Sequence, residues 1–400
     1  MSQQISIKSM FMSDMAQTNP EPIGIQIDHA EGCLLYDSDG NTYIDLISGI
    51  SVSSLGHQHP DIQRELHEQI DHHLHVMVYG EVIHSPTVNY AHNLLEDLPL
   101  SLNSVYFLNS GSEAIDAAMK LAKRFTRRST FVSQVQAYHG SGQGPLSLMD
   151  DDYFTQRYRP LLNGVYRIKQ NDIEAIDNLP KQGVAAVIVE LIQSERGALL
   201  ADANFIHGLR EYCHFTQSLL VFDEIQSGFY RTGTDYLFRQ FDIIPDMLII
   251  GKAAGGGLPM GAVITSREIM SAFTNNPILG HITTFGGHPL TARAGNAALK
   301  FLKKNLKVLE ISRKESLFKE LLVHERIHRV EGRGLLLACH LDESIDIIEF
   351  NKLLLGKGVF TDWFLFNMNA IRIAPPLIIN EEQIKEVCDA ILSSLTEYTN

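Results

Sequence analysis

Short runs of apolar residues alternate with amphipathic stretches through the middle of the chain, and this pattern predicts a sheet covered by helices. Residues 184–190, 219–223 and 247–251 are almost wholly apolar, as strands with both faces buried in a parallel sheet are. The amphipathic stretch 205–213 separates the first two runs and predicts a helix. Parallel strands need such crossover connections, so we expect an α/β core with a mainly parallel sheet.

Another strand-and-helix unit is expected upstream of these runs. Residues 105–109 and 130–135 predict strands, and residues 113–125 between them predict a helix. One apolar stripe recurs along that helix at helical spacing, formed by Ala114, Ala118, Leu121, Ala122 and Phe125. The turn at residues 109–113 therefore joins the end of a strand to the start of a helix.

Both ends of the chain predict a different arrangement. The Gly- and Asp-rich residues 37–41 lie between two candidate strands and indicate a hairpin. Beyond residue 290 the pattern predicts a helix, two short strands and a closing helix, at residues 290–306, 335–341, 371–373 and 381–398. We expect a small α+β domain assembled from residues 1–55 and 291–400, beside a large domain of residues 56–290.

Composition and charge narrow the classes of protein that fit. The 400 residues carry 33 Lys and Arg against 47 Asp and Glu, a net charge of −14, and 44% are apolar. An acidic protein of this kind does not suit a nucleic-acid partner, which basic patches would contact. No run approaches the roughly 18 apolar residues of a membrane span, and the polar N-terminus lacks the apolar core of a secretory signal. We expect a cytoplasmic protein.

Cysteine and histidine positions predict neither a disulfide framework nor a metal site. The four cysteines are scattered and form no Cys-X-X-Cys pair, at Cys33, Cys213, Cys339 and Cys388. The histidines between residues 57 and 75 fit no common zinc spacing.

Candidate chemistry lies where the predicted strands end, because open parallel sheets bind ligands at that edge. Ser110 followed by Glu113 fits a capping box, which is the common reason for such a turn. Alternatively, the amides of Gly111 and Ser112, with the Ser112 hydroxyl, bind a phosphate at the positive end of the helix dipole.

Asp223 closes one predicted apolar strand, and Lys252 directly follows another. A carboxylate at a buried strand end needs a partner. That partner is either a group of the protein, such as a cation or a loop amide, or a ligand in the crevice of the sheet. A lysine in a desolvated loop is a candidate covalent amine with a lowered pKa, whereas an arbitrary lysine is more often at the surface. Gly255, Gly256 and Gly257 follow Lys252 and permit a close approach of the backbone.

Several motifs carry a family resemblance over most of the chain. They are Tyr138-His-Gly140, the long block Asp223-Glu-Ile-Gln-Ser-Gly-Phe-Tyr-Arg-Thr-Gly233, Gly251-Lys-Ala-Ala-Gly-Gly-Gly257, Thr284-Phe-Gly-Gly287 and Arg372-Ile-Ala-Pro-Pro-Leu377. In this order they resemble the class-III (ornithine/ω-amino acid type) aminotransferases, which depend on pyridoxal 5′-phosphate and have fold type I. The resemblance implies an enzyme that moves an amino group from an amino acid or ω-amine donor to an oxo acid in two half-reactions.

The resemblance also assigns roles to individual residues. Lys252 would be the Schiff-base lysine and proton shuttle, and Asp223 would hold the pyridine nitrogen protonated. The other cofactor contacts would come from Gly111, Ser112, Tyr138, His139, Glu190, Gln226 and Thr284. Thr284 would reach the phosphate of a neighbouring subunit, which implies a homodimer with shared active sites.

Two positions bear on the substrate. Arg372 resembles the arginine that binds a substrate carboxylate, and we hypothesise that Glu195 masks it in one half-reaction and releases it in the other. Ornithine-type members commonly have Arg after the aromatic-X-Gly turn, where this chain has Ser141, so its turn looks more like that of ω-amine–pyruvate members.

Two alternatives remain at this point. The first is another reaction on the same cofactor, such as that of an aminomutase, a racemase or a decarboxylase, because the fold does not set the reaction. The second is a non-catalytic binding protein, which intact Lys252 and Asp223 argue against.

Overall fold

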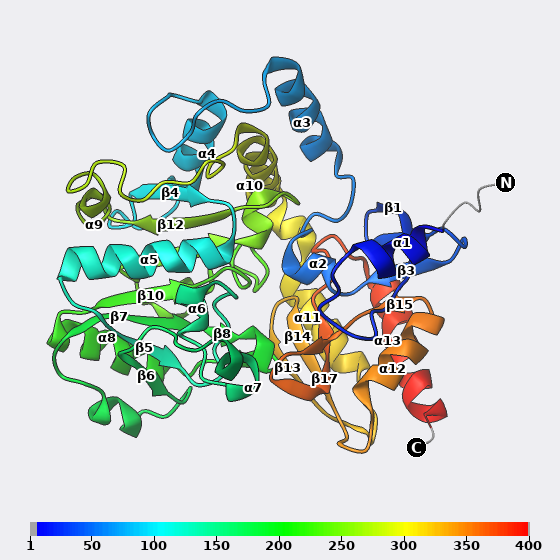
Figure 1. The fold of residues 1–400 in the computed structure, drawn as a ribbon. Helices are drawn as coiled ribbons and strands as arrows, with labels where there is room; N and C mark the ends of the chain where they lie inside the picture. The colour runs from blue at the N-terminus through cyan, green and yellow to red at the C-terminus, as the bar shows by residue number, and fades with distance from the viewer. Residues whose placement is uncertain (1–5, 399–400) are drawn as a thin grey trace.

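The three apolar runs form the centre of a seven-stranded sheet in the computed structural model of the chain, which describes residues 6–398 (Figure 1). The strands lie in the order β4-β12-β11-β10-β7-β5-β6. Their bounds are β4 Ser104–Leu108, β5 Thr130–Gln134, β6 Val165–Ile168, β7 Val184–Glu190, β10 Leu219–Asp223, β11 Met247–Gly251 and β12 Gly261–Thr265. The expected strands at 184–190, 219–223 and 247–251 are confirmed.

Strands β6, β5, β7, β10 and β11 pair in parallel, whereas β12 is antiparallel to both β11 and β4. Asp223 at the end of β10 is the register partner of Glu190 at the end of β7. The two carboxyl groups thus leave the same edge of the sheet. The mainly parallel sheet confirms the expected fold class.

Helices cover both faces of this sheet. The expected helix at 113–125 is α5, Gly111–Thr126, and that at 205–213 is α8, Ala203–Thr216. Along β10, Val221 packs in one cluster with the expected stripe of α5 up to Ala122, while Leu220 and Phe222 pack with residues of α8 in the other. Phe125, the last residue of the expected stripe, is exposed. Alternate side chains point to opposite faces of a strand, so a strand of consecutive apolar residues needs both helices.

A second group of elements lies on the other side of the molecule (Figure 1). Its sheets have the orders β1-β2-β3-β15 and β13-β14-β17-β16. Their bounds are β1 Ile27–Glu31, β2 Leu34–Asp37, β3 Thr42–Asp45, β13 Ile327–Arg333, β14 Leu336–Leu341, β15 Val359–Phe360, β16 Trp363–Phe364 and β17 Asn367–Ile373. The expected hairpin at 37–41 joins β2 to β3, and β15 pairs in parallel with β3, so both ends of the chain share one sheet.

The remaining helices pack around these sheets. The expected closing helix is α13, and the helix expected at 290–306 is α10, which packs on α3 and α4. The bounds are α1 Ile7–Asp14, α2 Ser48–Ser51, α3 Pro60–His72, α4 Ser85–Leu95, α6 Gln143–Leu146, α7 Asp152–Thr155, α9 Arg267–Met270, α10 Pro289–Leu309, α11 Ile311–Leu321, α12 Ile347–Gly356 and α13 Glu381–Glu397. Among residues 6–398 no helix is long and apolar enough to span a membrane.

Candidate active site

A pocket of about 340 Å³ lies at the carboxyl ends of the central strands. Glu190 ends β7, Asp223 ends β10 and Lys252 follows β11, and all three line this pocket. The start of α5 supplies Gly111 and Ser112 to its wall. The fold therefore brings together the strand-end residues that the sequence predicted.

Asp223 is held by a buried histidine. Its Oδ2 lies 2.7 Å from Nδ1 of His139, and its Oδ1 accepts a hydrogen bond from the amide of Ile225 at 3.0 Å. Burial alone would lower the pKa of His139, but the hydrogen bond and charge of Asp223 raise it above its usual value. Asp223 lines the pocket beside this imidazole and can accept a hydrogen bond from an N–H group of a ligand.

Lys252 has an unusual backbone and a buried amine. Its φ of 49° lies in the left-handed region, which is uncommon for a non-glycine residue. Its Nζ donates to Oε1 of Gln226 at 2.7 Å. Burial lowers the pKa of this amine, which the charge of Glu195 only partly opposes. A lowered pKa increases the fraction of neutral, nucleophilic amine.

Glu190 lies beside these groups as a buried carboxyl. It accepts hydrogen bonds from the amides of Tyr138 at 3.0 Å and Ser194 at 3.3 Å. Burial raises the pKa of Glu190 to about 7, although the nearby charge of His139 lowers it in part. Glu190 can therefore hold a proton near neutral pH.

The start of α5 forms a cradle that suits an anion. Ser110 caps the helix by accepting from the amide of Glu113 at 3.1 Å, which leaves the amides of Gly111 and Ser112 at the positive end of a 16-residue helix. The Ser112 hydroxyl accepts from the amide of Gly142 at 3.0 Å. The Ser110 half of the predicted capping box is therefore present. The cradle formed by Gly111 and Ser112 is present together with this cap.

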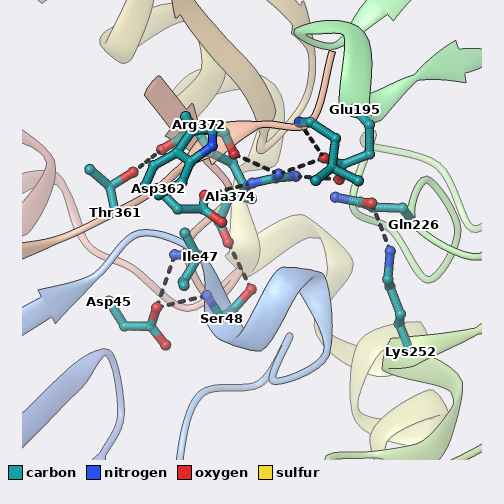
Figure 2. A network of polar contacts seen from close by, with 12 residues as sticks. Asp45, Ile47, Ser48, Glu195, Gln226, Lys252, Thr361, Asp362, Arg372 and Ala374 are labelled. Carbon is teal, nitrogen blue, oxygen red and sulfur yellow. Dashed lines mark hydrogen bonds and ion pairs between the residues drawn. The ribbon is translucent and has the colours of Figure 1, made fainter. Parts of the chain in front are cut away.

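A second polar cluster closes the pocket on its other side (Figure 2). The guanidinium of Arg372 forms a two-pronged pair with Glu195, both N–O distances being 3.1 Å. Its Nε donates to Asp362 at 2.8 Å, and NH2 also donates to the carbonyl of Trp363 at 3.1 Å. Burial alone would raise the pKa of Glu195, but Arg372 lowers it below its usual value.

Two predicted residues lie outside the pocket of this chain. Arg372 is 2% exposed and lies behind Glu195, which does line the pocket. Thr284 is exposed on the loop before α10, whereas its neighbour Thr283 accepts a hydrogen bond from Asn109 at 2.6 Å. Sequence reasoning missed Asp362 and the Trp363 carbonyl, because no local pattern marks residues that the pairing of β16 with β17 brings to Arg372.

The polar atoms of the pocket fit pyridoxal phosphate. Nε2 of His139 and the amide nitrogen of Gln226 are buried without a hydrogen-bond partner among the residues described. The cradle of Gly111 and Ser112 matches a phosphate, and Asp223 matches a protonated ring nitrogen. A carboxylate, a buried amine and an anion cradle thus lie at one edge of the sheet. Together they define an α/β enzyme that suits an aromatic phosphate with a carbonyl group.

Comparison with known proteins places the chain in a family. The sequence profile of the class-III aminotransferases matches residues 15–395. Acetylornithine aminotransferase of Aquifex aeolicus is 35% identical over 377 residues, which cover 92% of this chain and 95% of that protein. Acetylornithine aminotransferase of Methanopyrus kandleri is 34% identical, with 91% and 93% covered.

Solved structures agree with this placement. The ornithine aminotransferase of Toxoplasma gondii superimposes with a TM-score of 0.89 at 25% identity, covering 97% of this chain and 93% of that one. An adenosylmethionine-8-amino-7-oxononanoate aminotransferase from Methanocaldococcus jannaschii has the same fold, with a TM-score of 0.91 and 98% and 99% covered.

The chain belongs to the class-III aminotransferase family. It is a pyridoxal-phosphate-dependent enzyme that transfers amino groups, as the motifs of the sequence predicted.

Proposed function

We propose that this enzyme moves an amino group from an amine or amino-acid donor to an oxo acid, with Lys252 as its catalytic base and covalent amine. The observation that carries the proposal is the buried Nζ of Lys252 in the same pocket as Asp223 and the start of α5. Bound pyridoxal phosphate supplies a carbonyl that takes up the amino nitrogen and a ring that accepts electrons.

Each side chain then has a definite task. Lys252 Nζ would remove the proton from the carbon that bears the reacting nitrogen and return it to the carbon on the other side of that nitrogen. Asp223, supported by His139, keeps a proton on the ring nitrogen, and Gly111 with Ser112 binds the phosphate. Tyr138 would cover one face of the ring, and Gln226 and Glu190 would lie at its phenolic edge, since all three line the pocket.

The test uses Lys252→Ala beside Lys181→Ala. The first variant should lose at least about 10³-fold in turnover, as removal of a catalytic base does. The control should keep its activity, because Lys181 precedes the amino end of β7, at the edge of the sheet opposite the pocket. Borohydride treatment of the wild type should fix the mass of the cofactor on the peptide that contains Lys252. A Lys252→Ala variant that still transfers amino groups would refute the assignment.

Glu195 and Arg372 support a proposal for how one pocket takes two substrates. The guanidinium pairs with Glu195 while the donor reacts, and the carboxylate of the oxo acid displaces Glu195 in the second half-reaction. Glu195 belongs to the short segment Ser194–Arg196, whereas Arg372 belongs to β17. The backbone of Glu195 is held at the turn between β16 and β17, where its carbonyl accepts from the amide of Phe366 at 2.9 Å. The exchange would therefore require the Glu195 side chain to leave both Arg372 and the amide of Leu365, which donates to it at 3.2 Å.

A homodimer is the second part of the proposal. Large apolar side chains are exposed on the segments around α4 and before α10, among them Ile83 at 88% and Ile278 at 75%. Patches of this kind usually mark a protein interface. Burial of this surface against a second copy would place Thr284 beside the partner's phosphate cradle. Light scattering of the purified enzyme should give twice the mass of 44.8 kDa.

The domain boundaries and location follow as further proposals. We propose a large domain of residues 56–290 and a small one of residues 1–55 and 291–400, which the pairing of β15 with β3 supports. Hydrogen exchange should then protect the amides of β3 and β15 as one cooperative unit. All four cysteines are buried and free, which suits a cytoplasmic enzyme in a reducing compartment.

A further inference from the structure

A second cavity, of about 430 Å³, lies apart from the pocket that holds Lys252. The segment 19–23 forms one wall, and α12 and the segment from β15 to β16 form the others. These elements belong to the second group in Figure 1, whereas Lys252 follows a strand of the central sheet. The two cavities have no lining residue in common among the residues described. Small-molecule sites have volumes of about 300–1,000 Å³, so this cavity is large enough to be one.

The side chain of Asn351 is the main polar feature of this second cavity. Asn351 lines the cavity, and both its Oδ1 and its Nδ2 are buried without a hydrogen-bond partner among the residues described. Rotation of the amide by half a turn exchanges the two atoms and changes nothing, because neither atom has a partner. Buried donors and acceptors are rarely left unpaired in folded proteins, so this amide points to a partner from outside the chain.

Charge at the second cavity is confined to the surface of the molecule. Among the lining residues described, Lys352 is the one Lys or Arg and Glu21 is the one Asp or Glu, and both are exposed. Lys352 Nζ already donates to Oε1 of Glu349 at 2.7 Å. The interior thus offers neither a cation to an anionic ligand nor a carboxylate to a cationic one. A neutral ligand avoids the cost of burying an unpaired charge there.

The remaining walls are mostly apolar and partly aromatic. Phe360 and Trp363 are partly buried in the wall, and Ile23, Ile348 and Leu355 add aliphatic side chains. Aromatic side chains pack well against planar rings. The amide of Asn351 pairs best with another amide, because the two groups then exchange two hydrogen bonds, each donating one N–H to the oxygen of the other.

We infer that this cavity is a second binding site, which takes a small neutral molecule that carries an amide on an aromatic ring. The inference does not depend on the proposed function, because it uses no residue of the pocket that holds Lys252. Arg372 contacts residues of both cavities, since Glu195 lines the first and the carbonyl of Trp363, which lines the second, accepts from the guanidinium at 3.1 Å. The ligand would therefore lie next to the partners of Arg372.

Trp363 gives the second cavity a signal of its own, because it is the single tryptophan among the 400 residues. Holoenzyme labelled with fluorotryptophan should give one fluorine NMR resonance, which is titrated with benzamide. Acetophenone has the same shape but lacks the N–H donor, and benzoate has the same shape but carries a charge. We expect a saturable shift with benzamide, at a dissociation constant at least about tenfold below that of either analogue.

Asn351→Leu tests the site directly. Leucine has a similar size but no polar atom, and replacing an unpaired buried polar group by an apolar one of similar shape should leave the fold intact. The preference for benzamide over acetophenone should disappear in this variant. Asn204→Leu makes the same change at an exposed position of α8 and should keep the full preference. A preference that survived in Asn351→Leu would place the probe elsewhere and overturn the inference.

The wild-type titrations decide the matter even if Asn351→Leu does not fold. Equal affinity for benzamide and acetophenone would show that water alone satisfies the amide of Asn351, and the inference would fail. It would fail equally if none of the three probes shifted the Trp363 resonance. Neither result bears on amino transfer, which is measured separately by turnover.

Discussion

The pair between Glu195 and Arg372 makes a sharp prediction for a single side chain. Glu195→Gln keeps the shape of the side chain but replaces a charged hydrogen-bonded pair by a neutral one, which weakens it by about 1–2 kcal/mol. Arg372 should then be easier to reach, and KM for a monocarboxylate oxo acid should fall by about tenfold. Steady-state kinetics with pyruvate measure this.

Glu211→Gln is the matched control for that variant, because it removes the same charge at an exposed position of α8. An unchanged preference between monocarboxylate and dicarboxylate substrates in Glu195→Gln would contradict the exchange of partners on Arg372.

The site was predictable from sequence where strands end and unpredictable where distant segments meet. Asp223 and Lys252 could be located because each borders a run of consecutive apolar residues, and such a run has one carboxyl end. Asp362 could not, because it pairs with a residue 10 positions away through a hairpin whose register the sequence does not fix. The buried polar side chains that support Glu190, such as Gln134, were missed for the same reason.

Among the elements, α5 depends on a glycine in the loop that crosses its start. Gly140 has φ +117°, and a Cβ at that position would lie 2.5 Å from Cβ of Ser112. Gly140→Ala should therefore push the loop from the phosphate cradle and weaken cofactor binding by at least about tenfold, or about 1.4 kcal/mol. Titration of the apoenzyme with pyridoxal phosphate measures the effect.

Gly40→Ala is the control for Gly140→Ala, because it separates displacement of the loop from backbone strain. Gly40 has φ +88° but no atom within 4 Å of the added Cβ. Its variant should lose stability by about 1 kcal/mol through strain and keep its cofactor affinity. Equal affinity loss in both variants would show that strain, not the cradle, is responsible.

The N-cap residue of helix α10 is His288, and the protonation state of its ring decides whether the side chain can cap the helix. Nδ1 of His288 accepts from the amide of Leu290 at 3.3 Å, which requires the neutral ring. Burial lowers the pKa of His288, and the nearby rings of His75, His73 and His84 lower it further. A folded pKa below the unfolded value near 6.5 means that the unfolded chain binds more protons, so stability falls as pH falls below about 6.5.

His288→Asn should flatten that dependence, because asparagine caps a helix without titrating. Urea unfolding at about pH 5.5 and 7.5 should show the wild type losing about 1 kcal/mol more than the variant between the two values. Equal losses would assign the acid sensitivity to other groups.

Long buried strands were predictable as elements, whereas shorter or mixed ones were not. The runs at 184–190, 219–223 and 247–251 have the observed bounds because burial on both faces excludes polar residues along their whole length. The antiparallel placement of β12 and the existence of α3 and α4 were not predicted. Helix α3 buries little of its surface, with Gln69 as its one fully buried residue, so its pattern is mostly polar.

Arg231, which follows the central strand β10, forms hydrogen bonds with residues from both ends of the chain. Arg231 is 1% exposed and donates to the carbonyls of Leu335 and Pro375 and to the hydroxyls of Ser48 and Ser54. Burial lowers its pKa to about 9, although the charge of Asp45 raises it in part. Arg231→Met should cost about 3–5 kcal/mol by leaving these acceptors unpaired, and Arg64→Met at the surface should cost under about 0.5 kcal/mol. Chemical denaturation compares the two.

The net charge of the chain predicts how salt acts on the proposed dimer. Each subunit carries −14, so two subunits repel, while the exposed side chains such as Ile83 and Ile278 attract through burial of apolar surface. Salt screens the repulsion over about 10 Å at 0.1 M and leaves the apolar contribution in place, so the dimer should dissociate less at higher salt. Sedimentation at about 0.05 and 0.5 M NaCl measures the dissociation constant. Ile83→Asp should weaken association and cofactor affinity together, because Thr284 would leave the partner's cradle. Val323→Asp, at a residue that is 74% exposed after α11 and outside the segments around α4 and before α10, should change neither. A monomer that keeps full cofactor affinity would show that each chain completes its own site.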